Sequence, residues 1–179
     1  MDRTEGAAVR PDLPRHVVVM GVSGCGKSAV GARIASALGL PLVEGDAFHP
    51  EANIAKMRAG QPLTDDDRAG WLARLGHELQ SRSEGAVLAC SALRRSYRDL
   101  LRAAVPNLRF VHLAITQEES LRRVAQRSDH FYPPSLVASQ FLTLEDPWGE
   151  PGVVVVDGAL PLEQGVAQAL VGLGKQCSR

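Results

Sequence analysis

HVVVMGVSGCGKS, residues 16–28, passes from an apolar run into a glycine-rich loop that ends in lysine and serine. The loop matches the pattern G-x-x-x-x-G-K-[ST] in full, through Gly21, Gly26, Lys27 and Ser28. Glycines let backbone N–H groups converge on phosphate oxygens, and a helix after the loop adds the positive end of its dipole. The stretch therefore predicts a strand, a phosphate loop and a helix that together bind a nucleoside triphosphate.

The whole loop is expected to contact the nucleotide. Lys27 would reach the β- and γ-phosphates, and the Ser28 hydroxyl would bind Mg²⁺. The predicted ATP-binding residues are Gly21, Val22, Ser23, Gly24, Cys25, Gly26, Lys27, Ser28 and Ala29.

Short apolar strands alternate with segments of helical periodicity along the rest of the chain. Strands are expected at 16–20, 41–44, 86–90, 108–113 and 153–156, and helices at 51–58, from 64, and at 93–104, 116–126, 135–144 and 162–173. This alternation is typical of a parallel α/β sheet with helices on both faces. We expect a P-loop kinase fold with five parallel strands in the order 2-3-1-4-5.

The composition limits the class of protein. A chain of 179 residues fits one domain at 15–179, after a polar segment at 1–14 that is expected to be a disordered tail. Its 20 basic and 20 acidic residues create no field for nucleic acid or an anionic membrane. No apolar run approaches the roughly 20 residues of a membrane span. The separated Cys25, Cys90 and Cys177 suit free thiols, so we expect a cytoplasmic protein.

Two classes of nucleotide-binding protein lack their sequence signals here. A GTPase would carry a base-reading Asn-Lys-x-Asp segment after its fourth strand, where this chain has Ile115 and Thr116. A motor ATPase usually ends its third strand in a metal-binding acid, where this chain has Cys90 and Ser91. The remaining motifs favour a small kinase.

Two acids lie at the carboxyl end of the second predicted strand. Ligands of open α/β sheets bind beyond the carboxyl ends of the strands, so Glu44 and Asp46 would flank the γ-phosphate. Residues two apart in an extended strand point the same way, and Gly45 is expected to let the backbone turn. We assign Glu44 to Mg²⁺ together with Ser28, and Asp46 to the base that accepts the proton of the acceptor hydroxyl.

Arg123 and Arg127 are spaced i, i+4 on a predicted helix and would share one face of it. The next segment, 128–134, resembles a flap between two helices. Arginines beside such a flap can close over the transferring phosphate and exclude water. We therefore predict a mobile lid at about 123–140, with Arg123 and Arg127 acting in catalysis beside Lys27.

Four stretches resemble the gluconokinases, relatives of shikimate kinase among the small P-loop kinases. They are GVSGCGKS at 21–28, EGDAFHPEANIAKMRAGQPLTDDDRAGWL at 44–72, CSALRRSYRDLLR at 90–102 and HFYPPSLVASQFLTLEDP at 130–147. The first is common to many families, and the other three together are specific to this one. The resemblance implies phosphate transfer from ATP with Mg²⁺ to the terminal hydroxyl of D-gluconate. The product, 6-phosphogluconate, feeds the pentose phosphate pathway, and the family suggests a homodimer.

A sugar acid offers several hydroxyls and one carboxylate, so its pocket needs hydrogen-bonding groups of both polarities and a fixed cation. Trp71 is expected in the core, and the acids at 65–67 are expected only to stabilise a helix start. Gln140 and Phe141 are adjacent on a helix, so only one of them can face the pocket. The predicted substrate-binding residues are Asp46, His49, Asn53, Arg68, Ser91, Arg94, His130 and Gln140.

Two other functions stay open at this point. One is a small P-loop kinase for shikimate or a nucleotide, which is disfavoured because a glycine-rich acceptor loop after the third strand and a large aromatic surface are both missing. The other is a regulator that binds a sugar acid without phosphorylating it. Asp46 and the arginine pair argue against a regulator, because binding alone needs neither a base nor a lid cation.

Overall fold

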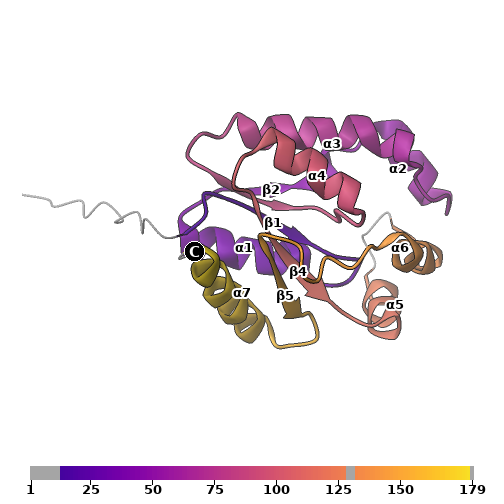
Figure 1. The fold of residues 1–179 in the computed structure, drawn as a ribbon. Helices are drawn as coiled ribbons and strands as arrows, with labels where there is room; N and C mark the ends of the chain where they lie inside the picture. Colours follow the sequence, from indigo (N-terminus) through magenta and orange to yellow (C-terminus); the bar gives the residue numbers. More distant parts are fainter. Residues whose placement is uncertain (1–12, 128–131, 178–179) are drawn as a thin grey trace, which may run out of the picture.

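A five-stranded parallel sheet forms the centre of the computed structural model, which describes residues 13–127 and 132–177 (Figure 1). Most of the predicted tail, at 1–12, and part of the predicted flap, at 128–131, lie outside these residues. The strands pair in the order β2-β3-β1-β4-β5, as predicted. They are β1 (His16–Met20), β2 (Leu42–Glu44), β3 (Ala86–Ala89), β4 (Arg109–Ala114) and β5 (Val153–Asp157).

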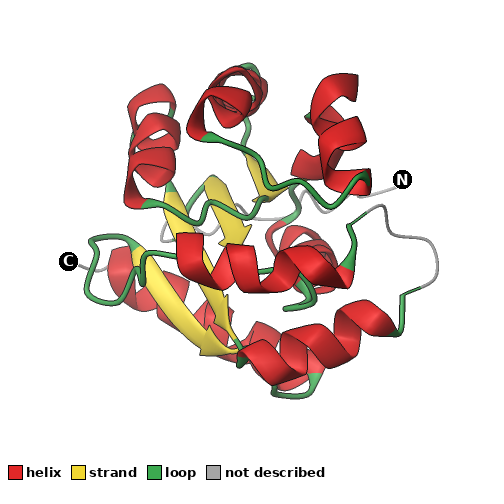
Figure 2. Cartoon of the chain, turned by 90° about the vertical axis from the view of Figure 1, so that its right-hand side faces the viewer, coloured by secondary structure: helices red, strands yellow, loops and turns green. Residues whose placement is uncertain are grey.

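Helices cover both faces of the sheet and one of its ends. In Figures 1 and 2, α3 and α4 lie over one face, α1 and α7 lie over the other, and α5 and α6 lie together at one end. None of the described helices is long and apolar enough to cross a membrane. The helices are α1 (Lys27–Leu38), α2 (Glu51–Arg58), α3 (Asp65–Gln80), α4 (Arg95–Ala104), α5 (Gln117–Ala125), α6 (Val137–Thr143) and α7 (Leu162–Cys177), with 3₁₀ turns η1 (Gly45–Phe48) and η2 (Pro134–Leu136).

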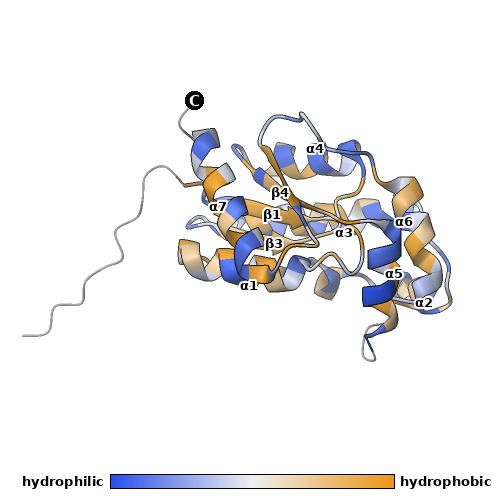
Figure 3. Ribbon diagram, turned by 90° about the horizontal axis from the view of Figure 1, so that it is seen from below, coloured by the Kyte–Doolittle hydropathy of each residue, from blue (hydrophilic) through white to orange (hydrophobic). Residues whose placement is uncertain are grey.

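The central strand β1 is apolar on both sides. Val18 and Met20 pack with α3 and α4, whereas Val17 and Val19 pack with α1 and α7. All four side chains are fully buried, which is typical of a parallel strand between two helical layers. Figure 3 shows the apolar strands between more polar helix surfaces. The phosphate loop therefore starts from the most buried part of the sheet.

Local capping explains where several helices begin and end. Gly39 adopts φ 67° and ends α1. The Thr64 hydroxyl accepts from the Asp67 amide, and the Asp67 carboxylate accepts from the Thr64 amide, which completes a capping box. Thr116 likewise caps α5 by accepting from the Glu119 amide. The Glu119 side chain instead binds arginines on its own helix and does not complete a capping box.

Two cysteines are buried free thiols. Cys25 lies in the phosphate loop and Cys90 follows β3. Burial raises the pKa of Cys90 to about 12, so its thiol stays protonated at neutral pH. The side chain of Cys177 lies outside the described part of the structure.

Candidate active site

The phosphate loop has a backbone that requires glycine at several positions. Gly21, Gly24 and Gly26 adopt φ of 144°, 80° and 98°, in the range that L side chains rarely adopt. A Cβ on Gly21 would also lie 2.9 Å from the Leu113 carbonyl oxygen. These conformations turn backbone N–H groups toward one concave surface at the start of α1.

The Lys27 ammonium lies against this loop. Its Nζ donates to the carbonyl oxygens of Gly21 and Val22, each at 3.1 Å. The Cys25 sulfur lies 4.0 Å from the same Nζ. The cation is thus held at the concave surface where phosphates are expected.

Ser28 and Glu44 come together from two different elements. Ser28 Oγ donates to Glu44 Oε2 at 2.9 Å. Hydroxyl and carboxylate oxygens are ligands that suit Mg²⁺, which usually keeps one or two protein ligands beside substrate phosphates. Within the described residues no group of three or more His, Cys, Asp or Glu could hold a metal ion. The Ser28–Glu44 pair therefore fits a metal that is shared with a nucleotide.

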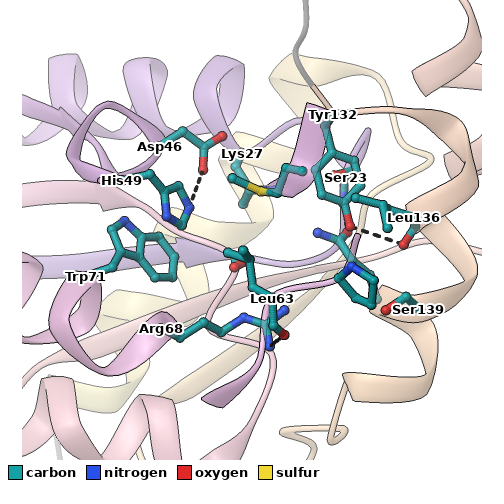
Figure 4. A pocket seen from close by; sticks show the side chains of 14 residues that line it. Ser23, Lys27, Asp46, His49, Leu63, Arg68, Trp71, Tyr132, Leu136 and Ser139 are labelled. Atoms are coloured by element: carbon teal, nitrogen blue, oxygen red, sulfur yellow. Dashed lines mark hydrogen bonds and ion pairs between the residues drawn. The ribbon is translucent and has the colours of Figure 1, made fainter. Parts of the chain in front are cut away.

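A pocket opens beside the phosphate loop (Figure 4). Asp46, His49 and Trp71 lie on one side of it, and Tyr132 and Ser139 lie on the other. Five of the predicted substrate-binding residues line it, namely Asp46, His49, Arg68, Ser91 and Gln140. The remaining lining residues are Ser23, Lys27, Met57, Pro62, Leu63, Trp71, Tyr132, Leu136 and Ser139.

Glu44 and Asp46 do not share the extended backbone that was predicted for them. Glu44 ends β2, whereas Asp46 lies in the 3₁₀ turn η1. Glu44 therefore faces Ser28, and Asp46 Oδ1 lies 3.9 Å from His49 Nε2. The backbone does turn at Gly45, where η1 begins, but glycine is needed there because a Cβ would lie 2.6 Å from the Ala89 carbonyl oxygen. Gly45 is needed for close packing against β3, not for an unusual φ.

His49 and Trp71 form a stacked pair at the pocket wall. Their ring centroids lie 4.1 Å apart with an interplanar angle of 15°. Trp71 is 2% exposed, as expected of a core residue, and it also lines the pocket. Burial is the main cause that lowers the pKa of His49, so the imidazole is neutral at pH 7.

Arg68 reaches the pocket from α3. Its Nη1 donates to the Leu63 carbonyl oxygen at 2.7 Å and to the Tyr97 hydroxyl at 3.2 Å. Among the described residues that line the pocket, two are cations, namely Lys27 and Arg68. Arg68 is thus a second cation of the pocket, held in place by its bonds to Leu63 and Tyr97.

The acids at 65–67 do more than stabilise the start of α3. Asp65 accepts from the Tyr97 hydroxyl and lies 3.3 Å from Arg94. Asp67 accepts from Lys56 Nζ at 2.8 Å, and this bond and the Thr64 amide bond lower the pKa of the partly buried Asp67 carboxyl to about 2. Arg94 was predicted to bind the substrate. It pairs with Asp65 and is not among the residues that line the pocket.

Asn53 also lies behind the pocket wall and does not line the pocket. Its side chain is buried, and Nδ2 donates to the Asp67 carbonyl oxygen at 2.8 Å. The same nitrogen lies 3.4 Å from His49 Nδ1. Asn53 therefore supports a pocket residue. His130, the remaining predicted substrate-binding residue, lies outside the described residues.

The two predicted lid arginines do not share a helix face. α5 ends at Ala125, so Arg127 lies beyond the helix. Arg123 Nε binds Glu119 Oε1 at 2.5 Å, and its Nη1 donates to the Gly24 carbonyl oxygen at 3.3 Å. Arg123 therefore contacts the phosphate loop directly.

Comparisons with known proteins agree with this geometry. A family model described as "AAA domain" matches residues 17–146. A gluconokinase of Gluconobacter oxydans (strain 621H) is 49% identical over 148 residues, covering 81% of this chain and 83% of that protein. The thermoresistant gluconokinase of Escherichia coli (strain K12) is 42% identical over 157 residues, covering 86% and 90%. This chain belongs to the gluconokinase family.

Solved structures of known proteins also match this chain. A crystal structure of a gluconokinase from Sinorhizobium meliloti 1021 matches with a TM-score of 0.86 and 52% identity, covering 93% of this chain and 95% of that one. Shikimate kinase from Aquifex aeolicus matches with a TM-score of 0.64 at 16% identity, which shows a shared fold alone. The family and fold predicted from the sequence are confirmed.

Within this gluconokinase-family fold, two contacts of the phosphate loop were missed by sequence reasoning. Ser120 Oγ on α5 donates to the Ser23 carbonyl oxygen at 2.7 Å. Gln140 Oε1 on α6 accepts from the Ser23 amide at 2.6 Å, whereas Phe141 packs into the core beside α1 and α7. A serine inside a helix gives no sequence signal for such a contact. The loop is thus held from both helices that border the predicted lid.

Proposed function

We propose that this protein transfers the γ-phosphate of ATP to the terminal hydroxyl of D-gluconate, giving 6-phosphogluconate. One observation carries the proposal: the phosphate loop and Lys27 open onto a single pocket that also holds Asp46 and Arg68. Membership of the gluconokinase family supports gluconate as the acceptor.

We assign the nucleotide to the phosphate loop, with Lys27 on the β- and γ-phosphates. Ser28 and Glu44 would hold Mg²⁺, a choice supported by their paired oxygens. When bound, the metal supplies charge neutralisation on the phosphates. Arg123 and Arg127 are proposed as further cations beside the loop, and residues 123–140 as the lid.

Asp46 is proposed as the base. It would accept a hydrogen bond from the terminal hydroxyl and so align the hydroxyl oxygen with the γ-phosphorus. The new oxygen–phosphorus bond forms as the bond to ADP breaks, and the hydroxyl proton passes to Asp46. Phosphoryl transfer depends mainly on positioning and charge, so the proton moves late in the step.

Arg68 is proposed to bind the carboxylate of gluconate. Guanidinium can form two parallel hydrogen bonds with a carboxylate, which fixes one end of the extended sugar acid. His49, Ser91 and Gln140 supply neutral groups for hydroxyls along the chain. A substrate held by its carboxylate at one end presents its terminal hydroxyl at the other.

A coupled assay of ADP release against a panel of sugar acids, shikimate and nucleoside monophosphates tests the function. We expect the highest kcat/KM for D-gluconate, and ³¹P NMR should show a phosphate monoester on the terminal carbon. Higher kcat/KM for shikimate or a nucleotide would identify a different small kinase. Binding of gluconate without ADP release would identify a sugar-acid regulator.

We also propose a single domain at 15–179, a homodimer and a cytoplasmic location. The dimer rests on the family resemblance, and light scattering after size-exclusion chromatography measures it. The buried thiols Cys25 and Cys90 suit a reducing compartment, and imaging of a fluorescent fusion measures the location.

A further inference from the structure

Two side chains, Asn53 and His49, link helix α2 to the proposed base. Asn53 Nδ2 donates to the Asp67 carbonyl oxygen at 2.8 Å and lies 3.4 Å from His49 Nδ1. On the other side of the imidazole, His49 Nε2 lies 3.9 Å from Asp46 Oδ1, the contact drawn in Figure 4. The ring is therefore held between an amide nitrogen and a carboxylate oxygen.

The Asp67 contact determines how the Asn53 amide is oriented. A carbonyl oxygen can only accept a hydrogen bond, so the atom that faces it is the NH₂ group. That NH₂ group offers its second hydrogen to His49, and His49 Nδ1 must then be an acceptor without a proton. A neutral imidazole carries one proton, which places this proton on Nε2.

The surroundings keep the ring neutral and fixed. The His49 side chain is 5% exposed, and burial lowers its pKa, as does the Arg68 charge, against the opposing effect of Asp46. The ring stacks on Trp71, and Trp71 Nε1 donates to the Gly45 carbonyl oxygen at 2.8 Å. The imidazole is therefore held in one plane.

The two tautomers fit these contacts in opposite ways. With the proton on Nε2, the ring accepts from Asn53 and directs a donor toward Asp46. With the proton on Nδ1, a donor would face the Asn53 NH₂ group, and a lone pair would face the Asp46 carboxylate. We infer that Asn53 is a positioning residue that holds His49 in the Nε2–H tautomer, so that a donor on His49 and an acceptor on Asp46 face the same part of the pocket.

This pairing orients a hydroxyl of the acceptor. A nitrogen–oxygen separation of 3.9 Å is too long for a direct hydrogen bond, but a hydroxyl oxygen beside both groups can bridge them. The hydroxyl oxygen would accept from His49 Nε2–H and donate its proton to Asp46. The inference rests on the proposed function in one respect, which is that Asp46 is the base.

NMR of ¹⁵N-labelled protein at neutral pH tests the tautomer without any turnover. Protonated and unprotonated ring nitrogens differ widely in ¹⁵N shift, and loss of signals in His49→Gln assigns the residue. We expect wild-type His49 as the Nε2–H tautomer. In Asn53→Asp the new carboxylate can only accept, so we expect a proton on Nδ1. A wild-type Nδ1–H ring, or an unchanged Nε2–H ring in Asn53→Asp, would overturn the inference.

Kinetics separate positioning from helix packing. We expect Asn53→Asp to lower kcat for gluconate about tenfold, within the usual coupling between contacting residues, with KM for ATP unchanged. In a His49→Gln background, Asn53→Asp should cause no further loss. Lys56→Ala is the matched control. It removes a neighbouring contact between α2 and α3, in which Lys56 Nζ donates to Asp67 Oδ1 at 2.8 Å, and it leaves the Asn53–His49 contact in place.

Lys56→Ala should leave both the tautomer and kcat unchanged. If it lowers kcat as much as Asn53→Asp does, the effect comes from helix packing and the inference is wrong. Asn53→Ala, which should give a mixture of tautomers, replaces Asn53→Asp if the latter does not fold. A wild-type protein that does not phosphorylate gluconate would overturn the proposed function and leave the tautomer result standing.

Discussion

At the scale of single residues, two acids separated by one glycine face different partners. Glu44 contacts Ser28, and Asp46 faces His49 and the pocket. Asp46→Asn keeps the size of the side chain and one acceptor oxygen but removes the carboxylate that is proposed to take the proton. We expect kcat to fall by roughly 10²–10⁴, the scale of general base catalysis, with ATP affinity nearly unchanged. Steady-state kinetics and ATP titration measure both, and turnover within about threefold of wild type would exclude Asp46 as the base.

Arg68 should act on binding more than on the chemical step. Arg68→Ala removes the described cation on the acceptor side of the pocket. Hydrogen bonds to charged groups contribute about 1.5–3 kcal/mol, so KM for gluconate should rise about 10- to 100-fold. Arg95→Ala is the control, because Arg95 is exposed on α4 and is absent from the pocket wall. Equal gluconate affinity in the two variants, measured by calorimetry, would remove Arg68 from the substrate site.

At the scale of elements, contacts within a few residues were predictable and contacts between distant segments were not. The strand and phosphate loop at 16–28 follow from a local pattern, and Thr64 and Gly39 mark helix ends through bonds to residues three or four positions away. The η1 turn at Asp46 depends on Gly45 packing against β3, which no local pattern records. The same holds for the bond from Asn53 to the Asp67 carbonyl oxygen, which lies on another helix.

The contact between α5 and the phosphate loop gives a prediction at this scale. Ser120→Ala removes the donor to the Ser23 carbonyl oxygen and leaves that buried oxygen without this bond. A net loss of about 0.5–1.5 kcal/mol corresponds to a rise in KM for ATP of about 2- to 12-fold. Ser36→Ala, on the exposed side of α1, is the control and should match wild type. An unchanged KM for ATP in Ser120→Ala would show that α5 does not position the loop.

At the scale of the whole molecule, one buried arginine joins α4 to the segment before β5. Arg98 is fully buried, and it donates to Glu150 and to the carbonyl oxygens of Ala92, Leu93 and Glu145. Ala92 adopts φ 43°, so this bond also holds a strained backbone turn.

Removing one partner of a buried ion pair costs about 3–5 kcal/mol when the other charge is left unpaired. The lower end applies here, because Glu150 is only partly buried and keeps Arg102 Nη2 at 2.9 Å. Arg98→Ala should lower the free energy of unfolding by that amount in urea denaturation. Arg95→Ala, with a side chain that is 65% exposed, should change it by less than about 0.5 kcal/mol. Similar values for the two variants would show that the Arg98 contacts do not stabilise the fold.

The stability of the molecule should also depend on pH through one core histidine. His112 lies in β4 and is 4% exposed, and burial is the main cause that lowers its pKa to about 4. The unfolded chain binds a proton on this residue near pH 6.5, whereas the folded protein does so only near pH 4. Stability therefore falls as the pH drops from 6.5 to 4, because the unfolded state binds more protons in that window.

A shift of this size corresponds to a loss of about 3 kcal/mol across the window. Urea denaturation at a series of pH values measures the slope, and His112→Gln should flatten it, since glutamine does not titrate. His77→Gln is the control, because His77 is exposed on α3 and its replacement should leave the slope unchanged. The neutral state of His112 fits its place in β4 between β1 and β5, where burial outweighs the opposing effect of Asp146. A slope that survives His112→Gln would assign the acid sensitivity to other buried groups, of which His49 is the first candidate.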